Sequence, residues 1–166
     1  MIIVDFKSLV NYYDKIIEYA EKTCECFSVI TKLEKPYSKV PPNCAHDEIL
    51  EILRPFILRQ IIGVRKWSYN GTKGNHAVMN VYSCSKKSLN ALRLLPNMLL
   101  PIENGLPEDI CFYRNGAVWL TTISHEEIAY IHSETESDIS FLKEVQILYN
   151  ISPFQDEQYH LPYEEN

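Results

Sequence analysis

The order of hydrophobic and polar positions near the start of the chain predicts a helix followed by a strand. Apolar side chains recur at helical spacing from Leu9 to Ala20, and Asp5 and Ser8 are both suitable N-caps, which predicts an amphipathic helix over residues 6–22. From Phe27 onward, apolar and β-branched side chains alternate with others, as in a half-buried strand. We expect this strand to end near residue 35.

Prolines divide the next part of the chain. Those within residues 36–42 predict an irregular connection, because proline lacks a backbone donor and restricts the residue before it. A second helix is expected from Asp47, limited or kinked by Pro55. The short apolar run over residues 56–64 does not distinguish helix from strand by its period. We favour continued helix there, and then a strand over residues 63–69.

Two further helices and a strand follow from the same pattern. Alternation predicts a strand over residues 76–84, and Ser85 is a suitable cap for a helix over residues 86–95 whose leucines share one face. Near the end of the chain, apolar positions again recur at helical spacing after Ser137 or Asp138. Either residue is expected to cap the last helix.

The dipeptide Asn115-Gly116 predicts a hairpin. Two β-rich runs, residues 110–114 and 118–123, flank it, and Asn-Gly is favoured at the centre of a type I′ turn because both positions need a positive φ. A third strand over residues 127–132 would extend this hairpin into an antiparallel meander.

The predicted elements define an α+β fold with an antiparallel meander sheet of five to six strands and about four helices. At 166 residues, the chain has the usual size of one domain, and about 70% of its unfolded surface can be buried. We predict one globular domain over residues 1–166, with a loosely packed acidic tail over residues 156–166.

Composition indicates a cytoplasmic protein. The start, MIIVDFKSLV, lacks the basic region of a secretory signal, and no segment has the roughly 18 unbroken apolar residues of a membrane span. The five cysteines are an odd set without a paired framework, which fits a reducing compartment. We therefore expect no membrane partner and a cytoplasmic location.

Charge is distributed unevenly along the chain. Residues 1–102 contain 14 Lys and Arg against 9 Asp and Glu, whereas residues 103–166 contain 2 against 13. Such asymmetry indicates an interaction surface, unless the two halves pack together and neutralise each other. Five carboxylates are concentrated where the hairpin ends and the last helix begins: Glu126, Glu127, Glu134, Glu136 and Asp138.

These five carboxylates are the predicted partner-binding residues. A turn between elements is expected to expose them, and their charge would attract a basic protein partner. The structural alternative applies to Glu134, Glu136 and Asp138, which lie near a helix N-terminus, where a carboxylate contributes about 0.3–1 kcal/mol through the helix dipole.

A catalytic site has one candidate nucleophile, Cys84. It stands where a predicted strand meets a helix, and the helix dipole can lower the pKa of a thiol in that position. A nucleophile also needs a base within hydrogen-bond reach, and His76 and His125 are the candidates. This alternative predicts a cysteine-dependent hydrolase or transferase.

Other ligands have less support. Cys24 and Cys26 are separated by one residue, which is closer than the usual spacing at structural zinc sites, and His125 and His132 add no recognised motif. We predict no metal. The glycines form no phosphate-binding motif, so no cofactor is expected. Cations and aromatics mix over residues 65–73, but the acidic chain as a whole opposes nucleic-acid binding.

Elimination leaves a non-catalytic protein-binding module as the predicted function. A small acidic α+β chain without a catalytic signature is similar in build to bacterial immunity and antitoxin-type inhibitors, which cover a partner protein. That similarity of class assigns no residues. The acidic C-terminal half is expected to engage the basic partner.

Overall fold

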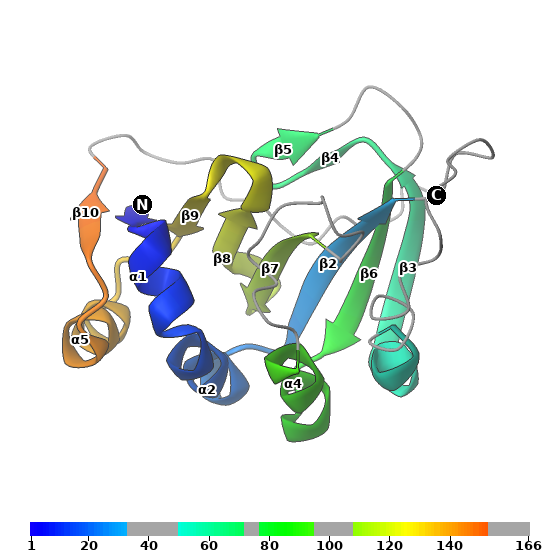
Figure 1. Ribbon diagram of the computed structural model, residues 1–166, viewed down its shortest axis with the longest axis horizontal. Helices are drawn as coiled ribbons and strands as arrows, with labels where there is room; N and C mark the ends of the chain where they lie inside the picture. Colours follow the sequence, from blue (N-terminus) through cyan, green and yellow to red (C-terminus); the bar gives the residue numbers. More distant parts are fainter. Residues whose placement is uncertain (33–49, 72–76, 95–107, 153–166) are drawn as a thin grey trace.

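The computed structural model describes residues 1–32, 50–71, 77–94 and 108–152, and its central element is an eight-stranded antiparallel sheet (Figure 1). The strand order is β10-β1-β9-β8-β7-β2-β6-β3. The strands are β1 (Ile2–Val4), β2 (Cys26–Lys32), β3 (Ile57–Val64), β6 (Ala77–Ser83), β7 (Glu108–Arg114), β8 (Ala117–Ile123), β9 (Ile128–Ile131) and β10 (Tyr149–Ile151). A separate hairpin joins β4 (Lys66–Trp67) to β5 (Asn70–Gly71).

The predicted α+β class is confirmed, but the predicted count of five to six strands is too low. The strands β1 and β10 have three residues each, too few to show alternation. The helix that we favoured over residues 56–64 is wrong, because residues 57–64 form β3 and pair with β6. The apolar run over residues 57–64 fits a helix or a strand by its period, and pairing with the buried strand β6 makes it a strand.

The helices lie along one side of the sheet (Figure 1), and three of the described helices begin at polar caps. The carboxylate of Asp5 accepts a hydrogen bond from the Ser8 backbone N–H at 2.8 Å, and Ser85 forms a capping box with Ser88. Residues 50–53 are also helical, and residues 47–49 lie outside the described part. The helices are α1 (Phe6–Asn11), α2 (Tyr13–Thr23), α4 (Lys86–Arg93) and α5 (Glu136–Val145), with 3-10 turns at η1 (Arg54–Phe56) and η3 (Ser124–Glu126).

Two helix boundaries differ from the prediction. The helix expected over residues 6–22 is divided into α1 and α2 at Tyr12, whose φ of −112° and ψ of 24° are not helical. The last helix is capped by Thr135, not by Ser137 or Asp138. Asp138 is therefore in the first turn of α5, and its side chain is buried.

The predicted hairpin is confirmed. Arg114 pairs with Ala117, so β7 and β8 are joined by a two-residue turn. Asn115 and Gly116 have φ values of 54° and 75°, as a type I′ turn requires. The strands β7, β8 and β9 are neighbours in that order, which is the predicted meander.

The main core lies between the helices and one face of the sheet. Leu9, Ile17, Leu92 and Leu142 come from α1, α2, α4 and α5, and each is at most 1% exposed. They pack in one cluster with strand residues such as Phe112. No helix in the described part of the chain has the length and apolar content needed to cross a membrane. The predicted acidic tail, residues 156–166, lies outside the described residues.

Candidate functional site

The sheet order places the two oppositely charged parts of the chain at opposite edges. One edge is formed by β2, β6 and β3, and the other by β8, β9, β1 and β10. The described residues 50–71 and 77–94 contain seven Lys and Arg and one Glu, whereas residues 117–152 contain one Lys and six Asp and Glu. We call the part around β3 the basic edge and the part around β10 the acidic edge.

Four of the five predicted partner-binding carboxylates are exposed, in two groups. Glu126 and Glu127 form the turn that precedes β9, whereas Glu134 and Glu136 follow β9 and begin α5. The Glu134 carboxylate accepts a hydrogen bond from the N-terminal ammonium group of Met1. The two groups therefore lie at opposite ends of β9 and do not form one continuous cluster.

These two groups border the outermost strand, β10. Val4 of β1 pairs with Ala129 of β9 on one side and with Tyr149 of β10 on the other. The end of β9 next to Glu127 therefore lies level with the start of β10. Glu127 and Tyr149 line the same hollow of about 560 Å³. At the other end, the N–H of Ser152 donates to the carbonyl of Met1, whose ammonium group contacts Glu134.

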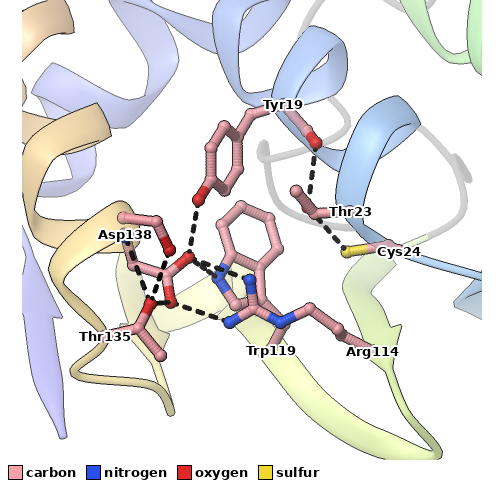
Figure 2. A network of polar contacts seen from close by, with 8 residues as sticks. Tyr19, Thr23, Cys24, Arg114, Trp119, Thr135 and Asp138 are labelled. Carbon is pink, nitrogen blue, oxygen red and sulfur yellow. Dashed lines mark hydrogen bonds and ion pairs between the residues drawn. The ribbon is translucent and has the colours of Figure 1, made fainter.

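Asp138 was expected to be exposed, and this expectation is wrong. Its side chain is 0% exposed and forms a bidentate ion pair with Arg114, with N–O distances of 3.1 and 2.7 Å. Figure 2 shows the Tyr19 hydroxyl and the Trp119 indole N–H directed at the same carboxylate, each at 3.0 Å from Oδ1. The Thr135 hydroxyl donates to Oδ2 at 2.5 Å.

The surroundings of Asp138 hold its carboxylate in the charged form. Burial alone raises the pKa of Asp138, but hydrogen bonds from Arg114, Ser133 and Thr135 outweigh burial and lower the pKa to about 2. Because its donors come from α2, β7, β8 and the start of α5, this carboxylate joins four elements. We assign Asp138 a structural role.

A groove of about 770 Å³ lies between α2 and α5, beside this network. Tyr19 and Phe141 stack on each other in its wall, with ring centroids 4.0 Å apart. The charged residues that line the groove are two lysines and two glutamates: Lys15, Lys22, Glu18 and Glu144. The groove therefore has no preference for one sign of charge.

The thiol of Cys84 lacks the activation that a nucleophile needs. It is half-buried, and burial together with the nearby Cys24, Cys26 and Glu25 raises the pKa of Cys84, opposite to the direction predicted from the helix dipole. Cys84 precedes the N-cap Ser85, so it is not in the first turn of α4, and the bond from its backbone N–H to the carbonyl of Glu25 holds it beside Cys24, Glu25 and Cys26.

The proposed bases are not placed beside this thiol. Cys84 lies beside the start of β2, because its neighbour Ser83 pairs with Cys26. His125 lies near the other end of β2. It follows Ser124, whose N–H bonds to Asp109, and the residue before Asp109 pairs with Ile30. His125 is thus separated from Cys84 along β2 by roughly 13 Å, at about 3.3 Å per residue. His132 is half-buried, and burial and the N-terminal ammonium group lower its pKa to about 4. His76 lies outside the described residues.

One group of three side chains has the donor types of a metal site. Ligand atoms of Glu108, Asp109 and His125 lie within 4.8 Å of one another. The Asp109 carboxylate accepts hydrogen bonds from the Trp67 indole N–H and the Ser124 backbone N–H, both at 2.8 Å, and from Asn70. These bonds tie the β4–β5 hairpin to β7, so they explain the burial of Asp109 without a metal.

The sequence did not indicate that apolar side chains would be exposed at both sheet edges. On β3, Ile57, Leu58 and Ile62 are 41%, 62% and 66% exposed. At the other edge, Ile151 of β10 and the preceding Leu148 are 54% and 67% exposed. No periodic signal could identify these positions, because exposure here depends on which strands are outermost.

The comparisons with known proteins do not assign a function. The chain matches no protein-family model, no curated protein and no solved structure.

Proposed function

We propose that the protein is a non-catalytic protein-binding module whose acidic edge engages a basic protein partner. The observation that carries the proposal is the separation of charge to opposite edges of one sheet. Five exposed glutamates but one exposed lysine lie in residues 117–152. A surface of one sign steers an oppositely charged partner and suppresses partners of like charge.

Exposed apolar side chains support a binding role for the same edge. Ile3, Leu148 and Ile151 are 39%, 67% and 54% exposed, and they lie on or beside β1 and β10. A protein interface typically combines an apolar centre with a polar rim. Here the carboxylates of Glu126, Glu127 and Glu134 would provide the rim.

An immunity or antitoxin-type inhibitor of the cytoplasm is the specific form that we propose for this module. The support for this form is the similarity of build and, for the compartment, the odd number of cysteines. A gene for a basic toxin-like protein immediately upstream would strengthen it. A neighbouring operon of unrelated enzymes would weaken it.

A cysteine-dependent hydrolase or transferase is the second candidate and has less support. It requires a thiolate at Cys84, whose pKa is raised by burial. It also requires a base beside that thiol, and His125 lies near the other end of β2.

The test uses two variants with the same change in net charge. In the first, Glu126→Lys and Glu127→Lys reverse the turn of the acidic edge. In the control, Asp14→Lys and Glu21→Lys reverse two carboxylates on α2. Proteins captured from a cell extract by the wild type and by the control, but not by the first variant, are the candidate partners.

The rate of association with the purified partner then decides the proposal. We expect the Glu126→Lys, Glu127→Lys variant to associate about tenfold more slowly, with a smaller change in the dissociation rate, because the lost contribution is mainly steering. High salt should remove most of this difference. Equal association rates for the two variants at low salt would refute the proposal.

A further inference from the structure

The basic edge of the sheet ends in the strand β3. Within the described residues, β3 has one strand neighbour, β6, on one side and is the last strand of the sheet on the other. An outermost strand presents unpaired backbone N–H and C=O groups, which can pair with another chain. Exposed apolar edge strands favour such pairing, and three apolar side chains of β3 are more than 40% exposed. The register of β3 with β6 shifts between Ile57 and Arg59 and between Ile62 and Val64, so residues 59–62 are its regular part.

The acidic edge has the same construction with the opposite charge. Within the described residues, β10 has one strand neighbour, β1, and it too is outermost. Glu127 lies at its first end and Glu134 at its second, whereas β3 contains Arg59 and is followed closely by Arg65 and Lys66. Each edge thus has an outermost strand, exposed apolar side chains and a net charge of one sign.

We infer that the acidic edge of one copy of this chain binds the basic edge of a second copy, with β10 of the first beside β3 of the second. This inference rests on the proposed function, because it names the basic partner of the acidic edge. Strand addition of this type gives main-chain hydrogen bonds, while side chains on alternate positions contribute apolar contacts.

Charge selects the head-to-tail arrangement over a symmetric one. A symmetric contact would place β3 against β3 or β10 against β10, and either would bring like charges together. The head-to-tail contact brings lysines and arginines to carboxylates, and a contact of this type uses two different surfaces of the same molecule. The ladder is short, since β10 has three residues. We therefore expect weak association that depends on concentration and salt.

The experiment begins with the unmodified chain of 166 residues. Sedimentation velocity is measured over a range of protein concentrations at low and at high salt. We expect the mean sedimentation coefficient to rise with concentration at low salt and to rise much less at high salt, because screening weakens the contact between the two edges. A chain that stays monomeric at every concentration at low salt overturns the inference.

Two variants then test the two edges separately. The acidic-edge variant has Glu126→Lys and Glu127→Lys, and the basic-edge variant has Leu58→Glu and Ile62→Glu. We expect each variant alone to remain monomeric. The first loses most of the negative charge of its acidic edge, and the second places two carboxylates in the apolar contact surface of its basic edge. A matched control, Leu94→Glu, changes a side chain that is 67% exposed at the end of α4 and should associate like the wild type.

Mixing the two variants gives the decisive result. The acidic-edge variant keeps an unmodified β3 and the basic-edge variant keeps an unmodified β10, so the mixture should associate although neither component does. A mixture that stays monomeric, or a basic-edge variant that associates like the wild type, overturns the inference. Circular dichroism checks that each variant is folded.

A different result would refute the proposed function. A monomeric wild type refutes only the second copy as the partner. The acidic edge itself is refuted when the capture experiment finds a partner whose association rate is equal for the Glu126→Lys, Glu127→Lys variant and for its α2 control.

Discussion

At the scale of single residues, the buried carboxylate of Asp138 joins four elements of the fold. Donors from α2, β7, β8 and the start of α5 converge on it (Figure 2). The pattern of the last helix was visible in the sequence, but the direction of this side chain was not. A carboxylate in the first turn of a helix interacts favourably with the helix dipole whether the side chain faces solvent or the core, so its position in the sequence does not reveal its direction.

Removing the charge of Asp138 should destabilise the fold. The substitution Asp138→Asn leaves Arg114 without its ion-pair partner in a place where the arginine side chain is 20% exposed. We expect a loss of about 3 kcal/mol in the free energy of unfolding, measured in urea. The control, Asp14→Asn, changes a side chain that is 73% exposed and should stay within about 0.5 kcal/mol of the wild type.

The same pair of proteins gives a pH test. Because the pKa of Asp138 is lowered from an ordinary value of 3.8 to about 2, its contribution is fully present above the ordinary value and is lost as pH falls through about 2. The difference in unfolding free energy between wild type and Asp138→Asn should therefore be constant near neutral pH and shrink in acid. A difference that grows in acid would contradict this assignment.

The raised pKa of Cys84 predicts slow chemistry. A thiol reacts as the thiolate, and burial raises the pKa of Cys84, so little thiolate is present at neutral pH. We expect iodoacetamide to alkylate Cys84 in the folded protein more slowly than it alkylates free glutathione at pH 7. The alkylation rate of Cys84 should rise only in strongly alkaline buffer, where its thiolate forms. Mass spectrometry of the Cys84 peptide measures this rate. Alkylation faster than glutathione at pH 7 would favour the enzymatic alternative.

At the scale of elements, local chemistry predicted some features and long-range pairing decided others. The Asn115-Gly116 turn and the caps at Asp5 and Ser85 were predictable because each depends on residues that are adjacent in sequence. The strand β3 was not, because its apolar run fits a helix as well as a strand. It is a strand in the fold because β6, twenty residues away, pairs with it.

The hairpin turn offers a direct test of backbone strain. Gly116 has a φ of +75°, and an added Cβ would meet nothing within 4 Å, so the cost of Gly116→Ala comes from the backbone alone. We expect a loss of about 1–2 kcal/mol in the free energy of unfolding. The control Asn115→Gly should change stability much less, since glycine adopts positive φ readily. Wild-type stability of Gly116→Ala would contradict the assigned turn.

At the scale of the whole molecule, the sheet order converts an asymmetry along the chain into one in space. The sequence predicted the uneven charge but left open whether the two halves would neutralise each other. In the described residues, the basic segments 50–71 and 77–94 lie toward one edge of the sheet and the acidic segment 117–152 toward the other, and β1 from the start of the chain joins the acidic edge. Strand order depends on contacts between distant residues, so periodicity could not reveal it.

The sequence correctly predicted the exposure of four of the five candidate carboxylates. Glu126, Glu127, Glu134 and Glu136 are exposed, as expected. They are divided between the two ends of β9 because that strand lies between them in the chain, and Asp138 is buried where it pairs with Arg114. Their role in binding a partner stays a proposal.

Hydrogen–deuterium exchange of the chain with and without its captured partner tests the central claim most directly. If the acidic edge is the contact surface, the backbone amides of β10 and of the turn at Glu126 and Glu127 should exchange more slowly in the complex, while those of α4 stay unchanged. Unchanged exchange in β10 and in this turn, with protection confined to α4 or to the groove between α2 and α5, would contradict the account.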